Sequence, residues 1–280
     1  EIGYSTKPGG ENTELQQAAY LARVVILNRT SKELKACVWH IGLWNDATSQ
    51  RELDFGLLRK HPKKSPVREP KPAFAAWATV SRMTYDAELV QELNIGRKLR
   101  VWLFNKRGTP MLIAYSLLPE PVDFQIVMNT PEVKVTEVCG KTSVRKLNDG
   151  VLKLRLTEAP VYIVGGNLDD FTGNKFNAEF SPENPSVVPG SAHTVKVRLP
   201  EGLASPTCKL SVQSDLPLTS RITGSGREWN VTLEAPARML PGDGEIFFRL
   251  EDNGSGKYIW QKTLTVKPPA ELTDVVPLAN

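Results

Sequence analysis

The sequence has few of the residues that build cross-linked or metal-bound frameworks. Its 280 residues include three cysteines and three histidines, and the cysteines (Cys37, Cys139 and Cys208) lie far apart with no Cys-x-x-Cys pair. An odd number of cysteines at this spacing indicates neither a disulfide scaffold nor a zinc site, so we expect buried thiols. No metal or other cofactor is expected. No run of 18 apolar residues is present, which excludes a membrane-spanning helix.

A strong charge of one sign is also missing. Lys and Arg together number 35 and Asp and Glu 31, which leaves a net charge of +4. This surplus is too small to indicate a nucleic-acid partner, and the basic cluster at 59–64 reads as a solvated loop. Hydrophobic residues make up 40% and charged residues 24%, as in ordinary globular proteins. The length predicts about two domains, with room for a small third one.

The first residues favour a piece of a longer protein. The chain opens with Glu1-Ile2-Gly3-Tyr4 and has neither an initiator methionine nor a secretory leader. Because this opening resembles the end of a strand, we interpret the chain as a C-terminal portion whose leader would lie in the missing part.

Residues 1–86 have the pattern of an α/β unit. Thr13 and Gln16 have the spacing of a capping box. The apolar residues after them recur at three- and four-residue intervals, which predicts a helix over about residues 14–28 with one apolar face: Leu15, Ala18, Ala19, Ala22, Val25 and Ile26. The all-apolar run at 36–39 predicts a strand covered on both faces. Pro72 predicts the start of a second helix, so two parallel, adjacent strands should alternate with two helices.

The rest of the chain predicts two β domains. Of the 21 prolines, 16 follow residue 86. Strand-like runs at 99–104, 111–117, 122–128, 133–138, 151–156 and 161–164 predict a small antiparallel β-sandwich over residues 87–166. Within it, Asp149-Gly150 is a hairpin signal.

Further strand-like runs lie at 194–199, 208–212, 229–233, 245–250 and 258–266. They predict about seven strands in an immunoglobulin-like antiparallel sandwich over residues 167–268, followed by a tail at 269–280. The Cys…Trp…Cys spacing of true immunoglobulin domains is absent. The expected fold class is therefore mixed α/β followed by all-β.

Five segments in order carry a resemblance to a known family. They begin at Glu1, Gln17, Val38, Phe55 and Lys71, and read Glu-Ile-Gly-Tyr-Ser-Thr, Gln-Ala-Ala-Tyr-Leu-Ala-Arg, Val-Trp-His, Phe-Gly-Leu-Leu and Lys-Pro-Ala-Phe. The series resembles the last quarter of a (β/α)8-barrel retaining glycoside hydrolase, of the clan that includes β-xylosidases and cellulase-like enzymes. Residues 1–86 would then be the last two βα units of a TIM barrel.

The resemblance implies roles for five residues. Glu1 would be the nucleophile, and the second catalytic carboxylate, about 5–5.5 Å away in such enzymes, is not in this sequence. Trp39 would be a platform under the sugar, with packing in the barrel core as the alternative. His40 would bind a sugar hydroxyl or cap the barrel, Trp44 would border the cleft, and Tyr4 would orient Glu1 or fill space.

The implied partner is a carbohydrate substrate, and the implied location is secreted or periplasmic. The chain alone should be inactive, because only one of the two catalytic carboxylates is present. The competing hypothesis is a noncatalytic β-sandwich protein that binds carbohydrate or a cell surface, and whose first 86 residues merely look barrel-like.

Overall fold

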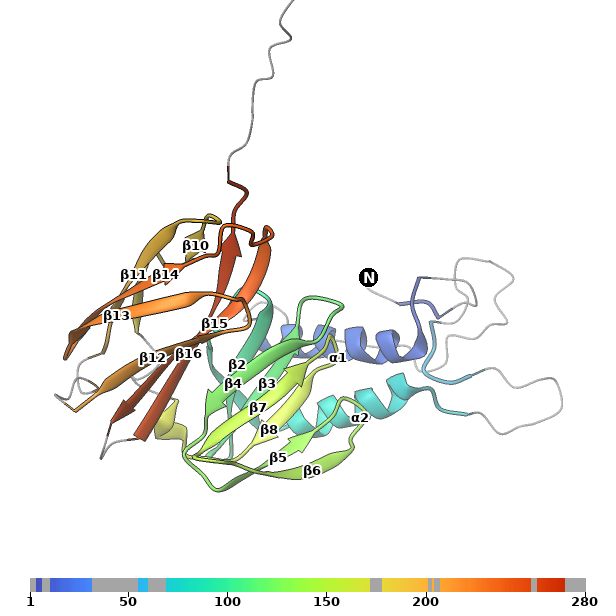
Figure 1. Ribbon diagram of the computed structural model, residues 1–280. Coiled ribbons are helices and arrows are strands. Elements are labelled where there is room, and N and C mark those ends of the chain that lie inside the picture. Colours follow the sequence, from blue (N-terminus) through green and yellow to red (C-terminus); the bar gives the residue numbers. More distant parts are fainter. Residues whose placement is uncertain are drawn as a thin grey trace, which may run out of the picture. The chain divides into compact units, whose positions relative to one another are not determined.

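The computed structural model (Figure 1) describes residues 4–6, 11–31, 55–59, 69–171, 178–200, 203, 207–252 and 256–269. The predicted strand at 36–39 and the residues Glu1, Trp39, His40 and Trp44 lie outside these ranges. Contacts divide the chain into two compact units. The first is drawn from Glu1–Asn94, Lys98–Phe124 and Met128–Thr172, and the second from Ile95–Arg97, Gln125–Val127 and Gly173–Asn280.

Two helices of the first unit lie side by side: α1 (Glu14–Thr30) and α2 (Pro72–Thr84). The Thr13–Gln16 capping box begins α1, and Pro72 stands in the first turn of α2, both as predicted. Small residues such as Ala22 on α1 and Ala76 on α2 are fully buried in one shared core, which lets the two helices approach closely. Leu15, predicted to lie on the apolar face, is instead 66% exposed: it lies in the first turn of α1, at the end of the face that carries the buried Ala18 and Ala22.

The first unit contains a six-stranded sheet in the order β1-β2-β3-β8-β5-β6 and a two-stranded sheet, β4-β7. The strands are β1 (Ala87–Glu92), β2 (Leu99–Lys106), β3 (Thr109–Ser116), β4 (Val122–Val127), β5 (Glu132–Thr136), β6 (Thr142–Lys146), β7 (Val151–Leu156) and β8 (Val161–Val164). Trp102, Tyr115 and Tyr162 on this sheet are buried with the helix residues in one core. They are core residues and do not form an exposed binding face.

All six strands predicted for this region occur. Two further strands, β1 and β6, have mainly exposed residues and form the two edges of the sheet, so they lack the apolar alternation that predicts a strand. The prediction of a hairpin at Asp149-Gly150 is wrong: the turn forms, with one isolated bridge between Asn148 and Val151, but the strands on its two sides do not pair. Both turn residues have positive φ (55° and 71°), as a tight turn requires. The flanking strands nevertheless enter different sheets, since β6 pairs with β5 and β7 with β4.

The second unit is a β-sandwich of two four-stranded sheets, β10-β16-β15-β12 and β13-β14-β11-β9. The strands are β9 (Glu179–Ser181), β10 (Ser186–Val187), β11 (Ala192–Arg198), β12 (Lys209–Ser214), β13 (Thr219–Ser225), β14 (Glu228–Glu234), β15 (Gly242–Asp252) and β16 (Gly256–Val266). Val195, Val231, Phe248 and Leu264 belong to the core between the sheets. The expectation of purely antiparallel sheets needs one correction, because β10 pairs with β16 in parallel over two residues.

Near the end of the first unit, the part of the chain that the structure describes holds one short 3-10 helix, η1 (Leu168–Asp170), and no sheet includes strands from both sides of it. No helix within the described ranges is long and apolar enough to cross a membrane. The expected burial of the cysteines holds for Cys208, whereas Cys139 is exposed. Cys139 lies in the turn after the end of β5. Its thiol donates to the carbonyl of Pro72 at 3.7 Å, but the residue remains exposed to solvent.

Candidate functional site

Four of the five segments that carry the family resemblance meet in the first unit, next to the beginning of α1. The described parts are residues 4–6, the first turns of α1, residues 55–58 and Lys71. Gln17 joins three of them. Its side chain is fully buried, and its amide nitrogen donates to the carbonyl of Tyr4 at 2.8 Å and to that of Phe55 at 3.1 Å. A buried amide held by two carbonyls fixes where both chain segments pass.

Lys71 joins the remaining segment to this junction. Its side chain is 3% exposed, and its ammonium donates to the hydroxyl of Thr6 at 2.9 Å. Its backbone N–H donates to the carbonyl of Leu57 at 2.8 Å, so the stretch 55–58 is bound directly to the start of α2. Leu57 is fully buried beneath this contact. The beginnings of both helices therefore lie beside the same short segment.

Tyr4 is the predicted site residue that the structure describes. Its ring packs on that of Tyr20 in α1, with the centroids 5.0 Å apart and the planes inclined by 54°. Burial raises the pKa of the Tyr4 hydroxyl, and the nearby Arg23 partly opposes this shift. Tyr4 therefore stays neutral at ordinary pH, and its ring holds residue 4 against α1.

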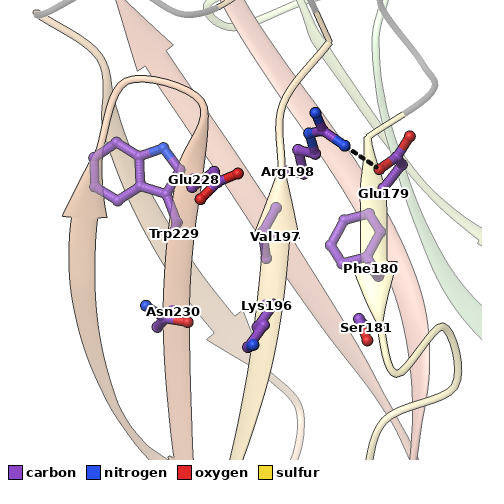
Figure 2. Close-up of a pocket in the computed structure, with 9 residues that line it drawn as sticks. All are labelled: Glu179, Phe180, Ser181, Lys196, Val197, Arg198, Glu228, Trp229 and Asn230. Atoms are coloured by element: carbon purple, nitrogen blue, oxygen red, sulfur yellow. Dashed lines mark ion pairs between the residues drawn. The ribbon is translucent and has the colours of Figure 1, made fainter.

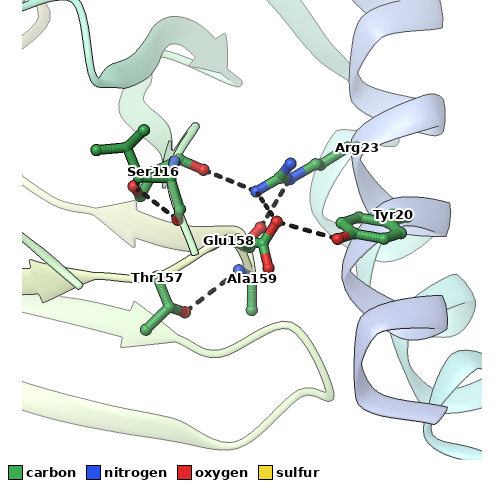
Figure 3. A network of polar contacts seen from close by, with 7 residues as sticks. Tyr20, Arg23, Ser116, Thr157, Glu158 and Ala159 are labelled. Carbon is green, nitrogen blue, oxygen red and sulfur yellow. Dashed lines mark hydrogen bonds and ion pairs between the residues drawn. The ribbon is translucent and has the colours of Figure 1, made fainter. Parts of the chain in front are cut away.

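Arg23, one turn further along α1, connects the helix to the sheet of the same unit (Figure 3). Its Nε donates to the carbonyl of Glu158 at 2.7 Å and its Nη2 to the carbonyl of Ser116 at 2.7 Å. The hydroxyl of Tyr20 donates to the carboxylate of Glu158 at 3.0 Å. The guanidinium lies over the ring of Tyr115 at 4.3 Å, a cation–π contact.

This network holds a positive charge in a largely enclosed place. The side chain of Arg23 is 15% exposed, and burial lowers the pKa of its guanidinium, while Tyr115 and Glu158 raise it. Arginine nevertheless remains protonated in proteins. The Arg23 guanidinium and the Tyr4 ring thus form two ends of one chain of contacts, which runs from the segment after Glu1 to the sheet.

The sequence-predicted site is only partly within the described residues. Glu1, Trp39, His40 and Trp44 lie outside them, so their roles stay predictions. Gln17, Tyr20, Arg23 and Lys71 were not selected as site residues. The signal was present: Gln17 lies four positions before the apolar Leu21, on the buried side of a helix, where a polar residue needs a hydrogen-bonding partner. Within the described residues, no group of three or more His, Cys, Asp or Glu side chains could hold a metal ion.

Comparison with protein-family models finds no match, and comparison with curated proteins finds no similar sequence. Among solved structures, the chain is similar to a family 39 glycoside hydrolase from the gut symbiont Bacteroides cellulosilyticus, at 24% identity and a TM-score of 0.47. That similarity covers 59% of this chain and 32% of the other, so the chain spans about a third of the length of that enzyme.

Two further solved structures have lower scores. CopC from Methylosinus trichosporium is 22% identical over 34% of this chain and 94% of its own, with a TM-score of 0.24. A nucleoside hydrolase-related protein from Saccharophagus degradans, described as associated with carbohydrate metabolism, is 15% identical over 32% of this chain and 25% of its own, also with a TM-score of 0.24.

Proposed function

We propose that this chain is the C-terminal part of a retaining glycoside hydrolase that cleaves O-glycosidic bonds in oligo- or polysaccharides. Residues 1–86 form the last two βα units of its barrel, 87–166 a small β-sandwich, 167–268 an immunoglobulin-like sandwich and 269–280 a tail. A polymeric substrate is met outside the cytoplasm, so the enzyme is secreted or periplasmic.

Glu1 is the nucleophile in this proposal. One of its carboxylate oxygens attacks the anomeric carbon, and the bond to the leaving oxygen breaks as a second carboxyl group protonates that oxygen. The same second group then takes a proton from water, which releases the sugar from the glycosyl-enzyme with its configuration retained. That second residue belongs to a part of the enzyme outside this sequence.

The neighbouring residues bind the sugar. Trp39 offers an aromatic face to the apolar C–H face of a pyranose ring. His40 hydrogen-bonds a sugar hydroxyl, and Trp44 borders the cleft. Tyr4 orients the segment that carries Glu1.

The observation that carries the proposal is the convergence around Gln17. The resemblance depends on the order of the five segments along the chain, and Phe55 lies 38 positions after its hydrogen-bonding partner Gln17. A chance series of short matches would have no reason to meet in space, yet the described parts of four of them are joined by hydrogen bonds of Gln17 and Lys71.

The decisive experiment replaces Glu1 with Gln in the full-length enzyme. Gln keeps the size of the side chain but cannot form the glycosyl ester, so kcat on an aryl glycoside should fall by several orders of magnitude while folding and sugar binding persist. Azide should restore turnover of the Glu1→Ala variant and give a product of inverted anomeric configuration, because the reaction then has a single displacement. The 280-residue chain alone should have no activity.

The matched control is Glu11→Gln, which removes an exposed carboxylate just before α1 and should leave the kinetics unchanged. Normal kinetics of the Glu1→Gln variant would end the catalytic assignment. In that case, the noncatalytic carbohydrate-binding or adhesion protein becomes the better account of the two β domains.

A further inference from the structure

The second unit has a sheet whose outer face is mainly polar. In β9, β11 and β14, buried apolar residues alternate with exposed polar ones. Phe180, Val197 and Trp229 are paired side by side across the three strands and belong to the core. The residues before and after them in each strand therefore lie on the outer face.

These outer residues line a hollow of about 590 Å³ (Figure 2). The strand register arranges them in two rows of three. One row holds Glu228, Arg198 and Glu179, and the other holds Asn230, Lys196 and Ser181. The volume lies in the range of small-molecule sites, which is roughly 300–1,000 Å³.

The hollow is electrically balanced and rich in both kinds of hydrogen-bonding group. It contains two cations and two carboxylates, and Arg198 and Glu179 approach each other at 3.6 Å as an exposed ion pair. Across the residues that the structure describes, the side chains of Ser181, Lys196, Glu228 and Asn230 make no hydrogen bond or ion pair, so they face solvent with their capacity unused.

This composition selects among ligand classes. A polyanion would meet Glu179 and Glu228, and a polycation would meet Lys196 and Arg198. An apolar ligand would find little apolar side-chain surface, because the three apolar residues of the lining, Phe180, Val197 and Trp229, are at most 9% exposed. A neutral sugar carries hydroxyl groups that both donate and accept, so it can satisfy the ammonium, the guanidinium, the carboxylates and the amide at once.

We propose that this hollow on β9, β11 and β14 binds a neutral saccharide unit of a polysaccharide chain. The proposal involves neither Glu1 nor catalysis. Binding is weak, with a Kd on the order of a millimolar, because the groups are solvated and no exposed aromatic ring stacks on the sugar. A weak second site still raises the local concentration of a long polymer around the protein.

The test is affinity electrophoresis of the intact 280-residue chain in gels that contain arabinoxylan, mixed-linkage β-glucan, glucomannan or galactomannan. We expect retardation by at least one of these neutral polymers. Arg198→Ala and Lys196→Ala should each weaken it about tenfold, since each removes a charge-assisted hydrogen bond. The Glu1→Gln variant should be retarded like the parent chain, which separates this result from that of the catalytic proposal.

Arg221→Ala is the matched control. Arg221 lies on β13 of the same sheet, outside the hollow, and approaches Glu234 at 3.9 Å, so the substitution removes the same charge from a similar exposed ion pair. It should leave retardation unchanged. The proposal is overturned if no neutral polymer retards the chain, if Arg221→Ala weakens binding as much as Arg198→Ala, or if dextran sulfate binds and the neutral polymers do not.

Discussion

In the first unit, polar side chains of α1 reach across to carbonyl groups of distant segments, whereas in the second unit two sheets face each other through apolar side chains. Gln17 and Arg23 each donate to two carbonyls from different parts of the chain. The core of the second unit is instead built around residues such as Phe180, Phe248 and Trp260, whose rings contact one another.

The two kinds of contact differ in how strictly each depends on geometry. Apolar burial depends mainly on area, so it stabilises many related packings of two sheets. A hydrogen bond to a buried carbonyl depends on distance and angle, so it selects one position for the segment that carries the carbonyl. The first unit therefore uses interactions that fix the position of individual chain segments.

The largest expected effect comes from truncating a side chain in the apolar core of the second unit. Phe248 is fully buried. Phe248→Ala should lower the free energy of unfolding of that unit by about 3–5 kcal/mol, through lost burial and a cavity. Hydrogen exchange measured by mass spectrometry should show faster exchange in β12, β15 and β16 and little change in α1. Leu240→Ala, at an 83% exposed position, is the control and should change nothing. Equal loss of protection in both units would contradict the comparison.

An intermediate effect is expected when Arg23 is replaced by Met. The variant keeps the aliphatic length but leaves the carbonyls of Ser116 and Glu158 without the guanidinium, which should cost the first unit about 2–4 kcal/mol. Exchange should accelerate in α1 and β3, whereas the second unit stays protected.

The control for Arg23 is Arg29→Met, an exposed position in the last turn of the same helix, which should be nearly neutral. If Arg23→Met behaved like Arg29→Met, apolar packing of α1 on the sheet would suffice and the polar network would be dispensable.

The smallest effect concerns an exposed ion pair and depends on pH. Arg59 donates two hydrogen bonds to Glu14, one of 2.6 Å and one of 2.9 Å, and this contact lowers the pKa of the Glu14 carboxyl from its ordinary 4.5. A lowered pKa in the folded state means that the stabilisation is present above the ordinary pKa and disappears as the pH falls below it. Glu14→Gln should thus be slightly less stable than the parent chain near pH 7, and the difference should shrink as the pH falls through the lowered, folded-state pKa of Glu14, in thermal melts at low salt. A difference that grew as the pH fell would have the wrong sign.

Elements were predictable where the signal is local. The capping box at Thr13, the proline at the start of α2 and the apolar runs of the strands each act within a few residues, and the corresponding elements occur. β1 and β6 escaped prediction because edge strands with exposed residues carry little apolar pattern. For the candidate site, the sequence indicated which segments belong together but not that Gln17 and Lys71 connect them.

The sequence by itself determined the helices, most strands, the tight turn at Asp149-Gly150 and the order of the five resembling segments, because capping, turn chemistry and periodicity depend on neighbours in the chain. Only the tertiary structure decided that β7 pairs with β4 and not with β6. It also decided that Leu15 and Cys139 are exposed, and that the polar side chains of Gln17, Arg23 and Lys71 are largely buried. Strand partners and burial depend on contacts between residues far apart in sequence. No local pattern encodes which distant carbonyl a buried side chain will reach.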